Sequence, residues 1–167
     1  LLIERENRIP LSNDILYLIS TIHNYNIFKD ASIDVNTNLS ILCNVLNHCK
    51  KKDIVFNFVS SWVVYGDLNN LPAKENTNCK PKGFYSITKK CAEDLLISFC
   101  ETFNIKYRIL RLSNILGKDL DTSNKKHALA NLIQRLKLDE EIELYNNGDF
   151  VRDILYIEDA CKAIHLI

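Results

Sequence analysis

Asp53-Ile-Val-Phe-Asn-Phe-Val-Ser60 is the stretch of sequence that decides the fold, because it is almost continuously apolar and a second serine, Ser61, follows it directly. Short runs rich in β-branched and aromatic residues are typical of strands that are buried on both faces, as in parallel sheets. Asp14-Ile-Leu-Tyr-Leu-Ile-Ser20 has the same character. The two runs therefore predict two buried strands of a parallel sheet.

Helical periodicity lies between and after these strands. The periodic apolar residues of the first helix are Leu39, Leu42, Leu46 and Cys49, and those of the second are Ala92, Leu95, Leu96, Phe99 and Phe103. Further strands are expected at 106–112 and 141–145, a turn at 146–148, and helices at 128–137 and from Glu158. Strands that alternate with helices predict an α/β fold with a parallel sheet.

Composition excludes several classes of protein. Among the 167 residues, 21 are basic and 21 acidic, so nothing indicates a nucleic-acid partner. No apolar run reaches the roughly 18 residues of a membrane span, and the first residues lack a signal-peptide pattern. The six cysteines form no Cys-x-x-Cys pair, so no metal site is expected. Reduced thiols of this kind indicate a cytoplasmic protein.

Tyr85-Ser-Ile-Thr-Lys89 is the motif that could carry chemistry. Residues four apart share one face of a helix, and a lysine ammonium held beside a phenol stabilises the phenolate. Such a tyrosine becomes a usable acid or base near neutral pH, and its pKa is expected to fall. Tyr25 and Lys29 have the same spacing, but they lie in a polar stretch, whereas Tyr85 opens a long amphipathic helix. The preferred pair is therefore Tyr85 and Lys89, and an ordinary exposed helix pair is the alternative.

The order of several blocks resembles the extended short-chain dehydrogenase/reductase family, the NAD-dependent epimerases, dehydratases and reductases of nucleotide sugars that include the UDP-glucose 4-epimerases. The similar segments are Thr37-Asn38, Ser60-Ser61-Trp62-Val63-Val64-Tyr65-Gly66, Tyr85 to Lys89, Arg111-Leu-Ser-Asn114-Ile-Leu-Gly117, Asn147-Gly148-Asp149-Phe-Val-Arg152-Asp153 and Tyr156-Ile-Glu-Asp159. The resemblance covers residues 14 to 167, and in it Thr37-Asn38 opens the first helix. It implies an α/β fold with a Rossmann-like, doubly wound parallel sheet.

The resemblance implies a role for each matching residue. Tyr85 would be the acid/base, Lys89 would tune it and hold the nicotinamide ribose of NAD or NADP, and Ser61 would orient the sugar hydroxyl. Asn38 would support the lysine through its backbone and a water molecule. Ser60 and Leu18 would lie along the cofactor. Trp62, Asn114 and Arg152 would contact the nucleotide-diphosphate sugar, and a guanidinium suits phosphate oxygens.

Each assignment has a plainer alternative. Asn38 could only cap a helix, Asn114 could only form a turn before Gly117, and Trp62 could be core packing. Arg152 could pair with Asp149 or Asp153. The roles of the neighbours Ser60 and Ser61 could also be exchanged.

The family's Gly-x-x-Gly-x-x-Gly motif is missing, because the four glycines are Gly66, Gly83, Gly117 and Gly148. Such glycines let the backbone approach a cofactor diphosphate. Together with the absence of methionine, this predicts that residues 1–167 are a partial Rossmann-type domain of a longer protein, with the start of a substrate lobe from about residue 115. By itself the piece would be inactive, and the choice between NAD and NADP stays open.

Trp62-Val63 narrows the expected reaction. Dehydratases of the resembled family carry Asp-Glu at this place and related decarboxylases keep a Glu, whereas tryptophan and valine transfer no protons. The expectation is therefore an epimerase, with a keto-sugar reductase, a non-catalytic remnant or binding protein, or an oxidoreductase for another substrate as alternatives. The resemblance also implies a homodimer through helices 37–49 and 86–103.

Overall fold

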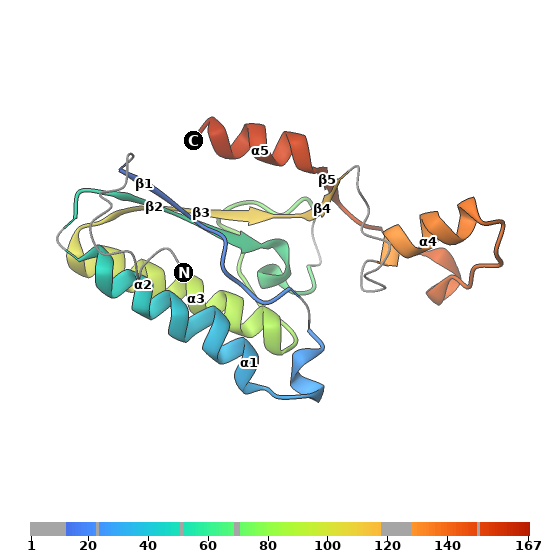
Figure 1. The fold of residues 1–167 in the computed structure, drawn as a ribbon, viewed down its shortest axis with the longest axis horizontal. Coiled ribbons are helices and arrows are strands. Elements are labelled where there is room, and N and C mark those ends of the chain that lie inside the picture. The colour runs from blue at the N-terminus through green and yellow to red at the C-terminus, as the bar shows by residue number, and fades with distance from the viewer. Residues whose placement is uncertain (1–12, 23, 51, 69–70, 118–127, 150) are drawn as a thin grey trace. The chain divides into compact units, whose positions relative to one another are not determined.

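Three strands form the sheet that organises the first part of the molecule. They are β1 Asp14–Tyr17, β2 Val55–Ser61 and β3 Lys106–Leu112, in the order β1-β2-β3. β1 and β2 are parallel, with Asp14 opposite Val55 and Tyr17 opposite Phe58. This computed structural model describes residues 13–22, 24–50, 52–68, 71–117, 128–149 and 151–167. Two compact units divide between Arg111 and Leu112, and Figure 1 shows their elements.

Helical segments cover one face of this sheet (Figure 1). The first runs through α1 Ser32–Val35, a π-helical turn Asn36–Ser40 and α2 Ile41–Cys49, and the second is α3 Phe84–Phe103. The alternation of strands and helices confirms the predicted α/β class. The expectation that Thr37-Asn38 opens the first helix is wrong. The helical segment begins at Ser32, whose backbone N–H donates a hydrogen bond to the Asp30 carboxylate at 2.8 Å.

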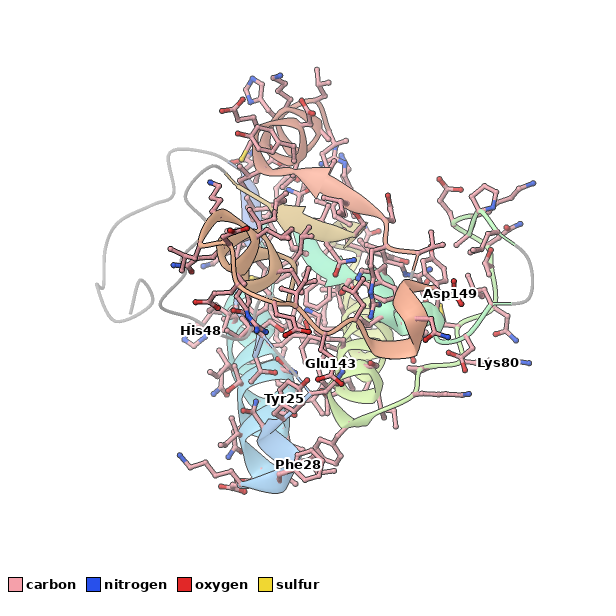
Figure 2. All side chains as sticks on the ribbon, turned by 90° about the vertical axis from the view of Figure 1, so that its right-hand side faces the viewer. Tyr25, Phe28, His48, Lys80, Glu143 and Asp149 are labelled. Carbon is pink, nitrogen blue, oxygen red and sulfur yellow. The ribbon has the colours of Figure 1, made fainter. Side chains whose placement is uncertain are left out.

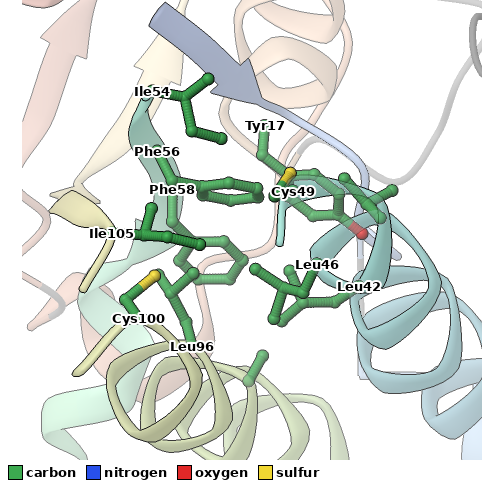
Figure 3. Packing of buried hydrophobic residues seen from close by; sticks show 12 residues of the cluster. Tyr17, Leu42, Leu46, Cys49, Ile54, Phe56, Phe58, Leu96, Cys100 and Ile105 are labelled. Atoms are coloured by element: carbon green, nitrogen blue, oxygen red, sulfur yellow. The ribbon is translucent and has the colours of Figure 1, made fainter. Parts of the chain in front are cut away.

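The core of the first unit lies between the sheet and these helices, as Figure 3 shows. Phe56 and Phe58 are almost completely buried and lie two apart on β2, so both point to the helices. Their rings each lie 5.7 Å from the ring of Tyr17 on β1. Leu42 and Leu96 close the other side of the cluster. The run 53–60 that the sequence predicts as a buried strand thus corresponds to β2, which runs from Val55 to Ser61 and is the central strand of the sheet.

Two details of the predicted strands and helices differ in the structure. β1 ends at Tyr17 rather than at Ser20, because Ser20 and Thr21 turn away and form hydrogen bonds with the Asn38 side chain. On α3 the buried stripe is Ala92, Leu96 and Cys100, each with no exposed surface. Leu95 and Phe103 keep 38% and 40% of their surface exposed, so their assignment to the core face is wrong.

The second unit contains a short parallel pair of strands, β4 Asn114–Leu116 and β5 Ile154–Tyr156. Its helices are α4 Ala128–Lys137 and α5 Ile157–His165. The predicted strand at 141–145 is not formed. Residues 141–144 are irregular, and a 3-10 helix, Tyr145–Gly148, follows them. Arg135 accounts for the path of this segment, because its guanidinium donates to the Glu141 carbonyl and pairs with Glu140 at 3.1 Å.

The part of the chain that the structure describes shows neither a metal-binding cluster nor a membrane-spanning helix. No cluster of three or more His, Cys, Asp or Glu side chains there could hold a metal ion. None of the helices in the described ranges combines the length and the apolar character that a bilayer crossing requires. The homodimer through helices 37–49 and 86–103 stays a prediction.

The corrected face of α3 can be tested by truncating two adjacent leucines. Leu96→Ala is expected to lower the free energy of unfolding by about 2–5 kcal/mol, because it leaves a cavity in the core. Leu95→Ala removes a partly exposed side chain and is expected to cost less than about 1 kcal/mol. Urea denaturation followed by circular dichroism measures both. Equal costs, or a larger cost for Leu95→Ala, would contradict the packing described here.

Candidate active site

Tyr85 and Lys89 both lie in the first turns of α3 and share one face of that helix. Gly83 precedes the helix with a φ of 86°, a conformation that favours glycine, and so aims the helix start. Tyr85 is half-buried, whereas Lys89 is only 2% exposed. The helix therefore presents a phenol near its beginning and a buried ammonium one turn later.

Two contacts hold the Lys89 ammonium against the sheet. Its Nζ donates a hydrogen bond to the Val59 carbonyl at 2.9 Å and lies 4.5 Å from the centre of the Phe58 ring. Burial lowers the pKa of Lys89 from 10.5 to about 8, and the negative charge of Glu93 partly opposes this change. Lys89 is thus a positive charge at neutral pH that loses its proton more readily than an exposed lysine does.

The pKa of Tyr85 departs from the prediction that Lys89 lowers it. Burial of the phenol is the largest effect and raises the pKa above its ordinary value of 10.0. A side-chain hydrogen bond between Ser20 and Tyr85 acts in the lowering direction, and the negative charge of Asp34 raises the pKa further. In this structure Tyr85 is therefore held as a phenol, and its function as a base needs a further positive charge or hydrogen bond to the phenolate.

Asn38 connects the two helical segments to the end of β1. Its Oδ1 accepts hydrogen bonds from the Ser20 hydroxyl at 3.0 Å and from the Thr21 backbone N–H at 2.9 Å. Its Nδ2 donates to the hydroxyls of Thr21 and Thr88, both at 3.0 Å. Thr88 in turn donates to the Tyr85 carbonyl at 2.9 Å. Asn38 lies in the π-helical turn, so it is not a helix cap; its side chain fixes Ser20 beside the Tyr85 helix.

The two serines at the end of β2 have different surroundings. Ser60 is buried, and its hydroxyl has no hydrogen-bond partner among the described residues. The Ser61 hydroxyl accepts a hydrogen bond from the Val63 N–H at 3.5 Å and so caps the 3-10 helix Trp62–Tyr65. Trp62 is half-buried at the start of this turn. Because β1 and β2 are parallel, their carboxyl ends place these residues at the same edge of the sheet as Ser20.

Leu18 lies just beyond β1 and is 63% exposed. It therefore belongs to the same edge of the sheet as Ser20. The Leu18 side chain is thus exposed, as it must be if it is to contact a cofactor.

A buried ion pair behind the site was not found by sequence reasoning. The Arg111 guanidinium binds the fully buried Glu93 carboxylate with two hydrogen bonds, at 3.0 and 2.8 Å. Its other face lies 4.8 Å from the centre of the Tyr65 ring. Hydrogen bonding to Glu93 is the main reason that the pKa of Arg111 is raised. Glu93 follows Tyr85 and Lys89 at the same four-residue spacing, and this spacing was the signal available in the sequence.

Arg111 thereby anchors the loop that follows Ser61. Gly66 ends the 3-10 turn with a φ of 69°, and a Cβ there would lie 1.8 Å from the Lys80 carbonyl oxygen, so only glycine fits. The Lys80 N–H donates to the Tyr65 carbonyl at 3.0 Å. The Arg111 guanidinium and the Lys80 backbone therefore both hold Tyr65 in place. Because Tyr65 ends the 3-10 turn that follows Ser61, these contacts also fix the position of Ser61.

Asn114 and Arg152 lie in the second unit. Asn114 begins β4, and its Nδ2 donates to the carbonyl of Asp153 at 2.9 Å. Arg152 directly precedes Asp153 and is exposed. The structure therefore brings the two predicted substrate-binding residues to neighbouring segments of one unit. Asn114 belongs to a strand rather than to a simple turn.

The alternative pair, Tyr25 and Lys29, does not share a helix. Tyr25 precedes a 3-10 helix of three residues, Asn26–Phe28, and is 65% exposed. Phe28 in the same segment is 86% exposed, and both rings are labelled in Figure 2. This pair lacks the buried ammonium that Lys89 provides, so the choice of Tyr85 and Lys89 rests on the better geometry.

Comparison with known proteins gives the family. A family model described as "NAD dependent epimerase/dehydratase family" matches residues 14–167. The chain belongs to this family. The chain spans about half the length of the curated relatives and solved structures that it matches.

Three members of the epimerase/dehydratase family illustrate the similarity. A UDP-glucose 4-epimerase from Thermotoga maritima, solved with UDP-glucose, has a TM-score of 0.83 and 25% identity, over 92% of this chain and 51% of that one. A UDP-N-acetylglucosamine 4-epimerase from Methanobrevibacter ruminantium has a TM-score of 0.83 and 26% identity, over 92% and 50%. A dTDP-glucose 4,6-dehydratase of Shigella flexneri is 29% identical over 74% of this chain and 36% of its own length.

The buried Arg111–Glu93 pair predicts a large loss of stability when one partner is neutralised. Glu93→Gln is expected to lower the free energy of unfolding by about 3 kcal/mol, because it leaves the guanidinium partly buried without its counter-charge. Asp94→Asn is the matched control, since Asp94 pairs with Lys90 on the exposed face of the same helix and should cost about 0.5 kcal/mol. Chemical denaturation that gave equal costs would show that the buried pair is not important for the fold.

The lowered pKa of Lys89 predicts a pH-dependent stability. In the unfolded chain the pKa is 10.5 and in the folded chain about 8, so between these values the unfolded state binds more protons and raising the pH favours folding. The Lys89→Met variant has no titrating ammonium at this position and cannot gain this stability. Subtracting its free energy of unfolding from that of the wild type cancels the contributions of the other titrating groups. The stability of the wild type relative to Lys89→Met is expected to rise from pH 8 towards pH 10, and a constant difference would contradict the burial of the ammonium.

Proposed function

We propose that this chain is the acid/base portion of an NAD(P)-dependent nucleotide-sugar epimerase. The observation that carries the proposal is the arrangement of Tyr85 and Lys89 on one face of α3, with Ser20 within hydrogen-bond reach of the phenol. Membership of the NAD dependent epimerase/dehydratase family supports it. Similarity to two sugar-nucleotide 4-epimerases supports epimerisation as the reaction.

The residues of this chain fit one end of the cofactor. Lys89 is a buried ammonium with more than one N–H, of which the Val59 carbonyl takes one. The buried Ser60 hydroxyl lacks a partner among the described residues, and Leu18 offers an apolar surface nearby. We assign Tyr85, Lys89, Ser60 and Leu18 to the nicotinamide ribose end of NAD or NADP. The glycine-rich cradle for the diphosphate is not in this chain's sequence and would belong to another part of the protein.

The proposed reaction moves one proton through Tyr85. NAD or NADP, when bound, would supply the redox chemistry, which is removal of a hydride from a sugar carbon and its return to the opposite face of that carbon. Tyr85 takes the proton of the sugar hydroxyl and later gives it back, and Ser61 orients that hydroxyl by a hydrogen bond. Because burial raises the pKa of Tyr85, the base step needs a further positive charge or hydrogen bond beside the phenolate. Asn38 holds the helix start and Ser20 in place for both proton transfers.

Asn114 and Arg152 are assigned to the nucleotide diphosphate of the substrate. An exposed guanidinium matches phosphate oxygens with two parallel hydrogen bonds. One N–H of the Asn114 Nδ2 is donated to the Asp153 carbonyl, and the second N–H of the same amide is the donor that could bind a phosphate oxygen. Trp62, at the start of the 3-10 turn after Ser61, would border the sugar.

A reductase of keto-sugars is the second candidate, and the raised pKa of Tyr85 favours it. In that reaction Tyr85 acts once, as a proton donor, which is the form that burial maintains. Dehydration is disfavoured, although a dehydratase is among the relatives. Elimination of water needs a further acid and base beside the serine, and Trp62 and Val63 occupy those places.

Substitution of the proposed acid/base tests this assignment. In the full-length protein that carries this chain, with NAD and UDP-glucose, Tyr85→Phe is expected to lower kcat for epimerisation by about 10²- to 10⁴-fold, since the proton transfer is lost. Tyr25→Phe is the matched control and should keep the activity of the wild type. Wild-type kcat in Tyr85→Phe would reject the mechanism. If the wild type only reduces a keto-sugar with NADPH, the reductase is the correct assignment.

A further inference from the structure

Thr88 on α3 is a buried threonine to which the proposed reaction assigns no part. The residue is 5% exposed, although threonine is most often found at the surface. Its hydroxyl donates a hydrogen bond to the Tyr85 carbonyl, three residues earlier on the same helix, at 2.9 Å. The same hydroxyl accepts a hydrogen bond from Nδ2 of Asn38, fifty residues earlier in the chain, at 3.0 Å. Thr88 therefore joins the start of α3 to the π-helical turn that carries Asn38.

The direction of these hydrogen bonds follows from groups that can only donate or only accept. The Thr21 backbone N–H can only donate, and it lies 2.9 Å from Asn38 Oδ1. This contact fixes the orientation of the Asn38 amide, so its Nδ2 is the atom that faces Thr88. The single hydroxyl proton of Thr88 is then available for the Tyr85 carbonyl, which can only accept. These groups thus form one chain of hydrogen bonds from the segment after β1 to the backbone of Tyr85.

Thr102, near the end of α3, shows what an ordinary threonine does in this helix. Its hydroxyl donates to the Ser98 carbonyl at 2.7 Å, and the residue is exposed. Hydrogen bonds of this kind to the preceding turn are common for helical threonines and hold no other segment in place. Thr88 makes a similar bond, but the side chain of Asn38 also donates to it. The contact with a distant segment is what distinguishes Thr88 from Thr102.

The chain of hydrogen bonds connects two parts of the proposed active site. Tyr85, at one end, carries the phenol that exchanges the proton. Thr21, at the other end, lies three residues after Leu18, which is assigned to the cofactor. The placement of the phenol relative to the cofactor therefore depends on a path in which Thr88 is the last side chain before Tyr85. Small displacements of a reacting group lower the rate of a reaction strongly.

We propose that Thr88 is a further positioning residue of the acid/base site, and that its hydroxyl fixes the backbone of Tyr85 relative to the segment after β1. This proposal rests on the proposed function of Tyr85. Thr88 acts through the Tyr85 carbonyl and through Asn38, so the role belongs to its hydroxyl and not to its shape. Valine has nearly the same shape, but it would leave one buried N–H of Asn38 without an acceptor.

Removal of the hydroxyl with little change of shape tests the proposal. The protein is the full-length chain that carries these residues, assayed with NAD and UDP-glucose. Thr88→Val is expected to lower kcat by about 10- to 100-fold and to leave the KM for UDP-glucose within about twofold of the wild type, because a misplaced acid/base slows the reaction without removing a substrate contact. Thr88→Ser restores the hydroxyl and should bring kcat back to within about threefold of the wild type.

Thr102→Val is the matched control, because it makes the same substitution on the same helix and removes only the exposed bond to Ser98. It should keep the kcat of the wild type. Equal losses of kcat in Thr88→Val and Thr88→Ser would overturn the proposal, since the hydroxyl would then not be the cause. Wild-type kcat in Thr88→Val would also overturn it, whether or not KM is raised.

A second measurement, by NMR, needs neither cofactor nor substrate. Both side-chain N–H groups of Asn38 are hydrogen-bonded, to the hydroxyls of Thr21 and Thr88, so their protons should exchange slowly with solvent in the wild type. Rapid exchange, as in an exposed asparagine, would overturn the proposal even if Thr88→Val fails to fold. The ring signal of Tyr85 in protein labelled with 13C-tyrosine should move in Thr88→Val and stay in place in Thr88→Ser and Thr102→Val. This pattern in a protein without epimerase activity would reject the proposed function alone.

Discussion

The buried ammonium of Lys89 is the constraint on which the rest of the site depends. A charge that is 2% exposed must replace its water by protein groups, and here the Val59 carbonyl and the face of the Phe58 ring do so. Both groups belong to β2, the central strand of the sheet. The lysine therefore joins the start of α3 to the centre of the sheet, and Tyr85, one turn earlier, is placed by the same contacts.

Two polar connections keep this arrangement rigid from opposite sides. Asn38 joins the segment after β1 to Thr88, next to Lys89 on α3. Arg111 joins β3 to Glu93, one turn beyond Lys89, and holds the ring of Tyr65 in the loop after Ser61. Each connection links segments far apart in the sequence, and each is buried enough for its loss to be costly. A proton-transfer site needs such support, because small displacements of the phenol would reduce its efficiency.

The fold was largely predictable, because its elements are local patterns. The apolar run 53–60 and the periodic helix after Gly83 predict the central strand and the helix that carry Tyr85 and Lys89. The failures have physical causes of another kind. Leu95 and Phe103 are apolar but lie beside the buried stripe of α3. The strand expected at 141–145 does not form, and Arg135 instead binds Glu140 and the backbone of Glu141.

The site was predictable only as far as its motif. Tyr85 and Lys89 are marked by their spacing, whereas Thr88 and Glu93 gain their importance from burial and from partners in distant segments. The raised pKa of Tyr85 is of the same kind, since burial is a property of the folded chain. The charges that decide how a phenol titrates are set by tertiary packing, which single-sequence patterns do not contain.

The central claim is that Lys89 is an ammonium held in the interior beside the proposed acid/base. The most direct measurement is its pKa by NMR of the lysine side-chain nitrogens, with Lys89→Met used to assign the resonance. The structure predicts that Lys89 titrates at a pH of about 8, well below the ordinary lysine value of 10.5. Titration of Lys89 together with the exposed lysines near 10.5 would contradict the account.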